Sequence, residues 1–94
     1  MRDKEKRVHL RISGKVQGVG FRYFCQTKAH EWGIRGWVRN RTGGDVELEA
    51  QSEVGTIQRF INEVKGGPPG ALVNDVQINE IPAQNTDEEF EVRF

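Results

Sequence analysis

The segment with the clearest chemistry runs from Gly14 to Arg22 and reads GKVQGVGFR, three glycines in seven positions and then an arginine. Glycines let a backbone turn tightly and bring its N–H groups close to a ligand. The start of a helix adds partial positive charge, which suits a small anion. Arg22 is opposed by the same helix dipole, which favours a carboxylate at that place. A bound dianion would compensate, so the segment predicts an anion site; the alternative is a plain turn whose glycines only relieve strain.

This glycine segment differs from the familiar nucleotide-binding loops. It lacks the G-x-x-x-x-G-K-[ST] pattern, and Tyr23 stands where a third glycine would complete G-x-G-x-x-G. Asn40 is the second candidate because it closes a short strand-like run. An asparagine before a turn usually satisfies local backbone groups, and that interpretation is favoured by the local sequence. A functional role for Asn40 requires the fold to bring it to the glycine segment.

The remaining candidates are weaker. His9 alternates outward from a strand pattern and is predicted to be solvated or at an edge, and His30 lies late in a helix pattern where a cation suits the dipole. Cys25 falls on an apolar stripe and is predicted to be a core residue rather than a nucleophile. Histidines, cysteines and carboxylates show no metal-ligand spacing, so we expect neither a metal nor another cofactor. A solvated strand face, rather than a basic aromatic patch, is the favoured interpretation of the arginines around Trp37, namely Arg35, Arg39 and Arg41.

Alternating and helical periodicities predict the elements that position these residues. Strands are indicated at 8–13, up to Asn40, at 45–50, at 73–78 with a phase slip before Ile81, and at 90–94. Helices are indicated at 21–32, ended by Gly33, and at 54–64, where the apolar stripe consists of Val54, Ile57, Ile61 and Val64. A tight hairpin turn is indicated at 42–45.

This element order, β-α-β-β-α-β with an extra short C-terminal strand, predicts an α+β fold, the ferredoxin-like α/β sandwich. Right-handed crossovers place both helices on one face of an antiparallel sheet. Its first and third strands are central neighbours, and the second lies beside the third. The loop after the first strand and the end of the second could therefore meet at one edge.

Composition narrows the classes of partner and compartment. The 94 residues fit one domain, expected at 8–94, after a flexible charged N-terminus at 1–7. Fourteen basic and fourteen acidic residues give a formal net charge of zero, which removes the electrostatic argument for nucleic acid or an anionic membrane as partner. A single cysteine and the lack of a long apolar run indicate a soluble, cytoplasmic chain. We expect it to be a monomer.

The chain closely resembles the acylphosphatase family. Gly14-x-Val16-Gln17-Gly18-Val19-x-Phe21-Arg22 matches the first signature of that family, and Gly36-Trp37-Val38-Arg39-Asn40 matches the start of the second. The likeness continues to the closing Phe90-x-Val92-Arg93-Phe94. Two departures lie outside the signatures: Ser52 replaces a common glycine, and Leu72 replaces a residue that is often basic.

The resemblance implies hydrolysis of acyl phosphates to a carboxylate and inorganic phosphate, without metal or cofactor. Arg22 would pair with the phosphoryl oxygens, and Asn40 would position the attacking water. A phosphate oxygen of the substrate would take the proton, since no residue is an evident general base. The backbone N–H groups implied to hold the phosphoryl group belong to Gln17, Gly18, Val19, Gly20, Phe21 and Arg22.

Two alternatives use the same fold. One is an RNA-binding module, which would stack bases on sheet aromatics; the acidic Asp45, Glu47 and Glu49 in the third strand argue against it. The other is an acylphosphatase-like domain that handles carbamoyl phosphate at the start of a larger maturation protein.

Overall fold

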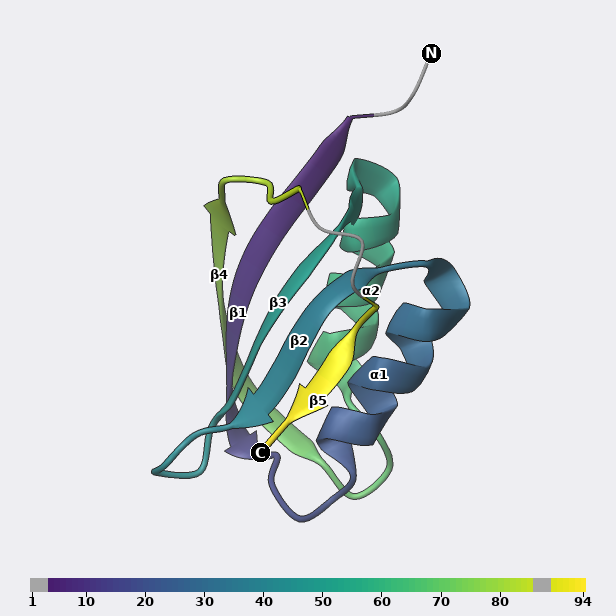
Figure 1. The fold of residues 1–94 in the computed structure, drawn as a ribbon. Helices are drawn as coiled ribbons and strands as arrows, with labels where there is room; N and C mark the ends of the chain where they lie inside the picture. Colours follow the sequence, from purple (N-terminus) through teal and green to yellow (C-terminus); the bar gives the residue numbers. More distant parts are fainter. Residues whose placement is uncertain (1–3, 86–88) are drawn as a thin grey trace.

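The computed structural model describes residues 4–85 and 89–94. Over these residues the chain forms five strands and two helices (Figure 1). In chain order the elements are β1 (Glu5–Lys15), α1 (Phe21–Trp32), β2 (Arg35–Asn40), β3 (Val46–Glu53), α2 (Val54–Gly66), β4 (Leu72–Ile81) and β5 (Glu91–Arg93). Within the described residues, neither helix has the length and apolar composition needed to cross a membrane.

The five strands form one sheet in the order β4-β1-β3-β2-β5. The predicted central pair is confirmed, because β1 and β3 are antiparallel neighbours and β2 lies beside β3. The prediction of a wholly antiparallel sheet is wrong at one edge, where β5 pairs with β2 in parallel. The physical reason is the direction of β4, which ends at the same end of the sheet at which β2 begins, so β5 runs the same way as β2 (Figure 1). The sheet is therefore mixed.

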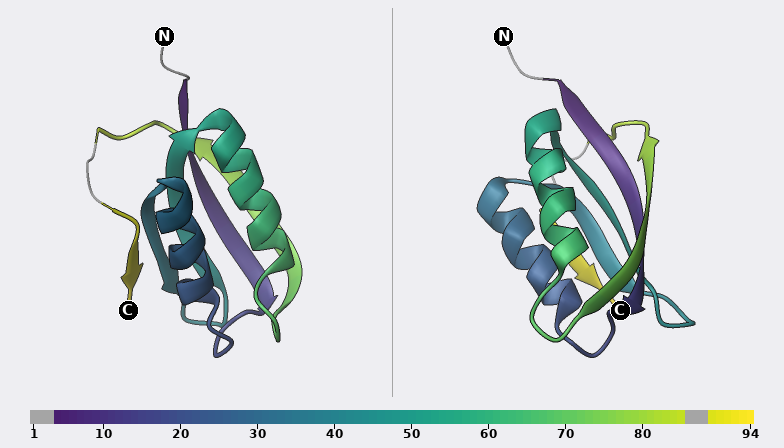
Figure 2. Two further views of the ribbon diagram at one scale, coloured as in Figure 1. Left: turned by 90° about the vertical axis from the view of Figure 1, so that its right-hand side faces the viewer. Right: turned by 180° about the vertical axis from the view of Figure 1, so that it is seen from behind.

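Both helices cover the same face of the sheet, as predicted, and leave the other face open (Figure 2). Side chains of alternating strand residues such as Leu10 and Leu48 point into this layer and are fully buried. In α1 the predicted stripe is confirmed, with Phe21, Cys25 and Ala29 buried. In α2 the predicted stripe is partly wrong: Val54 is the exposed first residue, and Phe60 joins the buried residues Ile57, Ile61 and Val64.

The first strand begins at Glu5, three residues before the predicted start at Val8. Arg7, assigned by the sequence to the flexible N-terminus, is only 3% exposed. Its guanidinium Nε donates to Oε1 of Glu49 at 2.8 Å, and Nη1 donates to Oε1 of Gln51 at 3.2 Å. These partners hold the polar start of β1 in the sheet. The predicted flexibility of residues 1–3 falls outside the described residues.

The irregularity of β4 lies nearer its start than the sequence predicts. The register against β1 shifts between Ser13 and Gly14, which places Asn74 as the extra residue, rather than slipping before Ile81. Gly14 has a φ of 126°, and a Cβ built there would lie 2.1 Å from the Leu72 carbonyl oxygen. This glycine, grouped by sequence with the loop, therefore permits close approach of β4 at the end of β1.

Candidate active site

A small pocket of about 120 Å³ lies where β1 ends and α1 begins. The glycine segment and Asn40 both line this pocket, as the predicted strand order allows. Gln17 and Val19, which were predicted to contribute backbone N–H groups, are not among its lining residues. The lining residues are Val16, Gly18, Gly20, Phe21, Arg22, Tyr23 and Asn40.

The start of α1 carries no compensation of its own for the helix dipole. Gly20 is the N-cap residue, with φ 77° and ψ 21°, a left-handed conformation that glycine adopts without steric cost. It offers no side chain to the first backbone N–H groups, and the first turn contains no acidic residue. The partial positive charge of the helix end therefore faces the pocket without an internal counter-charge.

Arg22 is half-buried at the pocket and is held by the end of β5. Its Nη1 donates to the carbonyl oxygen of Arg93 at 3.2 Å, and its Cζ lies 4.7 Å from the ring centroid of Phe94. Cation–π contact and hydrogen bond together restrict the guanidinium. Sequence reasoning missed these partners, because nothing local to Arg22 indicates a contact with the last strand.

Asn40 is the last residue of β2 and pairs with Val46 of β3. The predicted turn follows it, closed by a hydrogen bond from the Arg41 N–H to the Asp45 carbonyl oxygen at 2.8 Å. The side chain of Gln17 reaches this turn from the glycine segment: its Nε2 lies 2.8 Å from each of the carbonyl oxygens of Arg41 and Asp45. The Gln17 side chain therefore links the glycine segment to the hairpin that directly follows Asn40.

On the open face of the sheet, behind the hairpin, the Glu47 carboxylate contacts one histidine and two arginines. Its carboxylate lies 2.6 Å from Nε2 of His9, 2.8 Å from Nε of Arg39 and 3.7 Å from Nη1 of Arg41. Burial raises the pKa of the Glu47 carboxyl. Hydrogen bonds from His9 and Arg39 and the charges of these groups lower it by more, so the pKa lies below its ordinary value. His9 points outward, as predicted, and its side chain is 25% exposed against Glu47. The prediction of an edge position is wrong, because β1 is a central strand.

The arginines around Trp37 are held on the open face. Arg39 and Arg93 stack on the Trp37 ring at 5.4 and 4.9 Å from its centroid. Arg35 pairs with Glu5 at the other end of this face. This arrangement agrees with a solvated strand face whose cations are paired with carboxylates.

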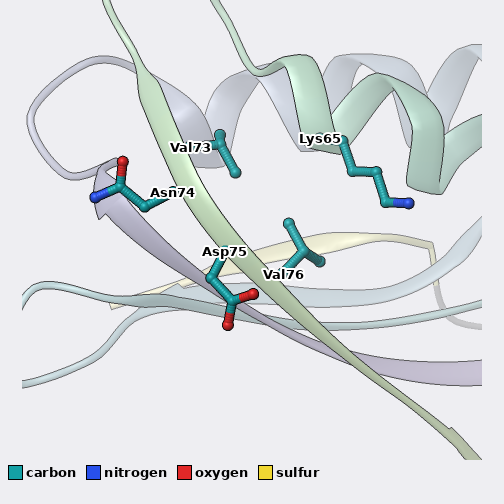
Figure 3. A pocket seen from close by; sticks show the side chains of 5 residues that line it. All are labelled: Lys65, Val73, Asn74, Asp75 and Val76. Atoms are coloured by element: carbon teal, nitrogen blue, oxygen red, sulfur yellow. The ribbon is translucent and has the colours of Figure 1, made fainter.

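Two further hollows are not lined by the glycine segment or by Arg22. One of about 320 Å³ lies between the end of α2 and β4, where the polar ends of its side chains point apart (Figure 3). It is lined by Lys65, Val73, Asn74, Asp75 and Val76. The other, of about 280 Å³, adjoins the small pocket through Asn40 and is lined by that residue with Arg39, Arg41 and Thr42.

The remaining residues singled out by the sequence do not line the pocket. Cys25 is buried, as predicted, and burial raises the pKa of its thiol to about 12, which keeps it protonated and unreactive at neutral pH. Nε2 of His30 lies 3.0 Å from the Phe90 carbonyl oxygen, beside β5. Ser52 lies within β3, and Leu72 is the exposed first residue of β4. Among the described residues, no group of three or more histidines, cysteines and carboxylates could hold a metal ion.

Comparison with known proteins bears on this arrangement. A family model described as acylphosphatase matches residues 8–92. The acylphosphatase of Oceanobacillus iheyensis is 42% identical over 90 residues, which cover 95% of this chain and 99% of that protein. The solved structure of an acylphosphatase from Coxiella burnetii is 42% identical with a TM-score of 0.89, over 95% of this chain and 93% of that one. A structure of full-length HypF in its phosphate- and nucleotide-bound form matches all of this chain with 12% of its own length, at 28% identity and a TM-score of 0.90.

The fold is a ferredoxin-like α+β sandwich, with a small pocket at the junction of β1 and α1. The chain belongs to the acylphosphatase family, whose members are hydrolases acting on acid anhydrides.

Proposed function

We propose that this protein hydrolyses acyl phosphates by attack of water at phosphorus in the pocket between the glycine segment and Asn40. The observation that carries the proposal is that pocket itself, where Arg22, the uncompensated start of α1 and Asn40 line one hollow. At about 120 Å³ the pocket is smaller than the roughly 300–1,000 Å³ typical of sites that enclose drug-sized ligands. It therefore suits a phosphoryl group, with the acyl part of the substrate outside.

The phosphoryl oxygens would be held by backbone N–H groups from Gln17 to Arg22 and by the Arg22 guanidinium. Phosphoryl transfer demands charge stabilisation on the equatorial oxygens and in-line positioning, with little covalent chemistry from the protein. Fixed N–H groups and a helix N-terminus provide that stabilisation without reorganising during the reaction. Arg22 adds a planar fork that matches two phosphoryl oxygens.

Asn40 would hold the attacking water, since its amide offers an acceptor and two donors. As the water oxygen bonds to phosphorus, the bond from phosphorus to the acyl oxygen breaks and the carboxylate leaves with the electron pair. A non-bridging phosphoryl oxygen takes the water proton, so the products are a carboxylate and inorganic phosphate. Among the described residues that line the pocket, none carries a carboxylate or an imidazole. A carboxylate leaves at neutral pH unprotonated, so no general acid is needed.

The proposal includes the partners expected from the sequence. They are a small acyl phosphate and inorganic phosphate, and the protein acts as a monomer in the cytoplasm without a metal. An RNA-binding role has less support, because Trp37, the aromatic ring on the open face of β2, is covered by Arg39 and Arg93.

The test is hydrolysis of benzoyl phosphate by the purified protein in the presence of a chelator. Arg22→Ala should lower kcat/KM by at least about 100-fold, the scale of one lost preorganised donor. Arg22→Lys should rescue poorly because an ammonium lacks the fork. Arg59→Ala is the matched control, because Arg59 is exposed on α2 and stacks on Trp32 at the end of α1, which does not line the pocket. Near-normal turnover by Arg22→Ala would contradict the proposal.

Inorganic phosphate separates binding from water positioning. It should inhibit the wild type competitively, and Asn40→Ala should lower kcat strongly while phosphate still inhibits at a similar concentration. Asn62→Ala, at an exposed position of α2, serves as control. Loss of phosphate inhibition in Asn40→Ala would assign Asn40 to binding instead.

A further inference from the structure

The side chain of Gln17 joins the two halves of the candidate active site. Gln17 lies in the glycine segment between Val16 and Gly18, and both of those neighbours line the pocket. Its half-buried side chain turns toward the hairpin between β2 and β3. There Nε2 lies 2.8 Å from the carbonyl oxygen of Arg41 and 2.8 Å from that of Asp45. A side-chain amide has two N–H donors, so this pair of carbonyls uses both.

The two carbonyl groups are those that fix the start of the turn. The Arg41 N–H donates to the Asp45 carbonyl at 2.8 Å, and the Gly44 N–H donates to the Arg41 carbonyl at 3.3 Å. Arg41 directly follows Asn40 in the chain, so its carbonyl group is only one residue away from Asn40. Holding that carbonyl therefore restricts where the Asn40 amide stands relative to the glycine segment.

We propose that Gln17 is a positioning residue, whose side-chain amide sets the distance between Asn40 and the phosphoryl-binding segment. The inference rests on the proposed function, in which Asn40 holds water and the segment holds phosphate. It assigns to the Gln17 side chain a role separate from its backbone N–H. The role acts through another residue, because the Gln17 side chain is directed at two backbone carbonyls of the hairpin.

Two catalytic parameters distinguish positioning from binding. If Gln17 positions Asn40, loss of its amide displaces the water and leaves the phosphoryl cradle in place. Displacement of a reacting group by about 1 Å can cost on the order of 100-fold in rate. We therefore expect Gln17→Met, which has similar length and no N–H donor, to lower kcat for benzoyl phosphate by about 10- to 100-fold. The inhibition constant of inorganic phosphate should stay near the wild-type value.

Gln17→Glu and Gln17→Asn refine the test. The carboxylate of Gln17→Glu keeps the shape but faces two carbonyl oxygens with no hydrogen to donate, so it should be at least as damaging as Gln17→Met. Gln17→Asn keeps the donors on a stem one methylene shorter and should retain more activity than Gln17→Met. Gln58→Met, on the exposed side of α2, is the matched control. Thermal unfolding of each variant checks that it is folded, and Gln17→Asn replaces Gln17→Met if the latter is not.

The decisive measurement is a double-mutant cycle between Gln17 and Asn40. Residues that act as a unit are not additive, so Gln17→Met should cause little further loss of kcat in the Asn40→Ala background. Full multiplication of the two effects, or a phosphate inhibition constant that rises in step with the loss of activity, would overturn the inference and leave the proposed function intact. A wild-type protein that fails to hydrolyse benzoyl phosphate would overturn the proposed function itself.

Discussion

Two glutamines tie distant segments to opposite ends of the sheet, and their surroundings differ in an instructive way. Gln17 reaches from the end of β1 to the carbonyls of Arg41 and Asp45 in the β2–β3 hairpin. Gln51, in β3, exchanges two hydrogen bonds with the backbone of Gln84 in the segment after β4, each 2.8 Å long. Both side chains hydrogen-bond to backbone groups that lie outside the strand pairs.

The two glutamine side chains differ in their burial and in the residues beside them. Gln17 is half-buried and its neighbours in the chain line the pocket, whereas Gln51 is 1% exposed and contacts the buried Arg7 guanidinium. A polar group that is buried and satisfied contributes mainly to stability, because its partners cannot turn to water when it is lost. A tie beside a pocket contributes mainly to geometry. We therefore expect substitutions at the Gln51 end to lower the free energy of unfolding, and those at the Gln17 end to lower kcat.

The largest effect on stability should come from Arg7→Met at the Gln51 end. The Arg7 guanidinium is paired with Glu49 and hydrogen-bonded to Gln51, and its removal strips both of a charged partner. The free energy of unfolding should fall by about 3 kcal/mol, the scale of breaking a buried ion pair. Urea unfolding measures this, and benzoyl phosphate hydrolysis below the transition should retain the wild-type kcat.

Arg11→Met is the control for Arg7→Met. Arg11 pairs with Asp45 at the exposed pocket end of the same strand. Such a surface pair contributes about 0–1 kcal/mol, so the control should unfold close to the wild type. A folded Arg7→Met protein with kcat reduced as far as in Gln17→Met would remove the distinction between the two ends.

A smaller loss of stability is expected from Gln51→Leu. The Gln84 N–H and carbonyl would lose their partner, and Arg7 would lose one of its acceptors. Arg7 is buried, and leaving a buried group short of a partner costs about 1–3 kcal/mol, which differential scanning calorimetry can resolve. Gln84 is exposed, so its backbone groups can bond water instead. Gln58→Leu on α2 is the surface control. A melting temperature equal to that of the wild type would show that the Gln51 tie is replaceable by water.

The pocket end was more predictable from sequence than the Gln51 end. The structure confirms that the glycine segment, Arg22 and Asn40 line one pocket, because the strand order follows from the element order. The anion site itself stays a prediction. The Gln17 side chain was missed because its acceptors are backbone carbonyls, which no residue type marks. Gln51 alternates with apolar residues in β3 and resembles any solvent-facing position until a segment more than thirty residues later lies against it.

The strand errors have similar causes. The spacing of three between Val73 and Val76 already breaks a period of two, and the structure places the extra residue there, opposite Gly14. Ile81 attracted attention because it precedes proline, a local signal, whereas the close approach at Gly14 depends on the neighbouring strand. The parallel direction of β5 is set by where the chain leaves β4, which periodicity does not contain.

The smallest expected effect is on the pH dependence of the free energy of unfolding, and it comes from Glu47. This buried carboxylate lies at the pocket end of the open face and pairs with the arginines on either side of Asn40. Because its pKa is lowered in the folded protein, its contribution to stability is fully present above the ordinary value of 4.5 and is lost as the pH falls through the lower folded value. The free energy of unfolding of the wild type should therefore decline more steeply with acid below pH 4.5 than that of Glu47→Gln.

Glu63→Gln, on the exposed side of α2, should keep the wild-type slope. At neutral pH, Glu47→Gln should lower kcat less than Gln17→Met does, because the Gln17 amide holds the hairpin backbone itself while Glu47 contacts side chains. Equal losses of kcat in Glu47→Gln and Gln17→Met would mean that the ion pairs on the open face position Asn40 as well, and that geometry at the pocket end depends on charge. In that case kcat would fall over the same pH range as stability, which the acid titration of both quantities can establish directly.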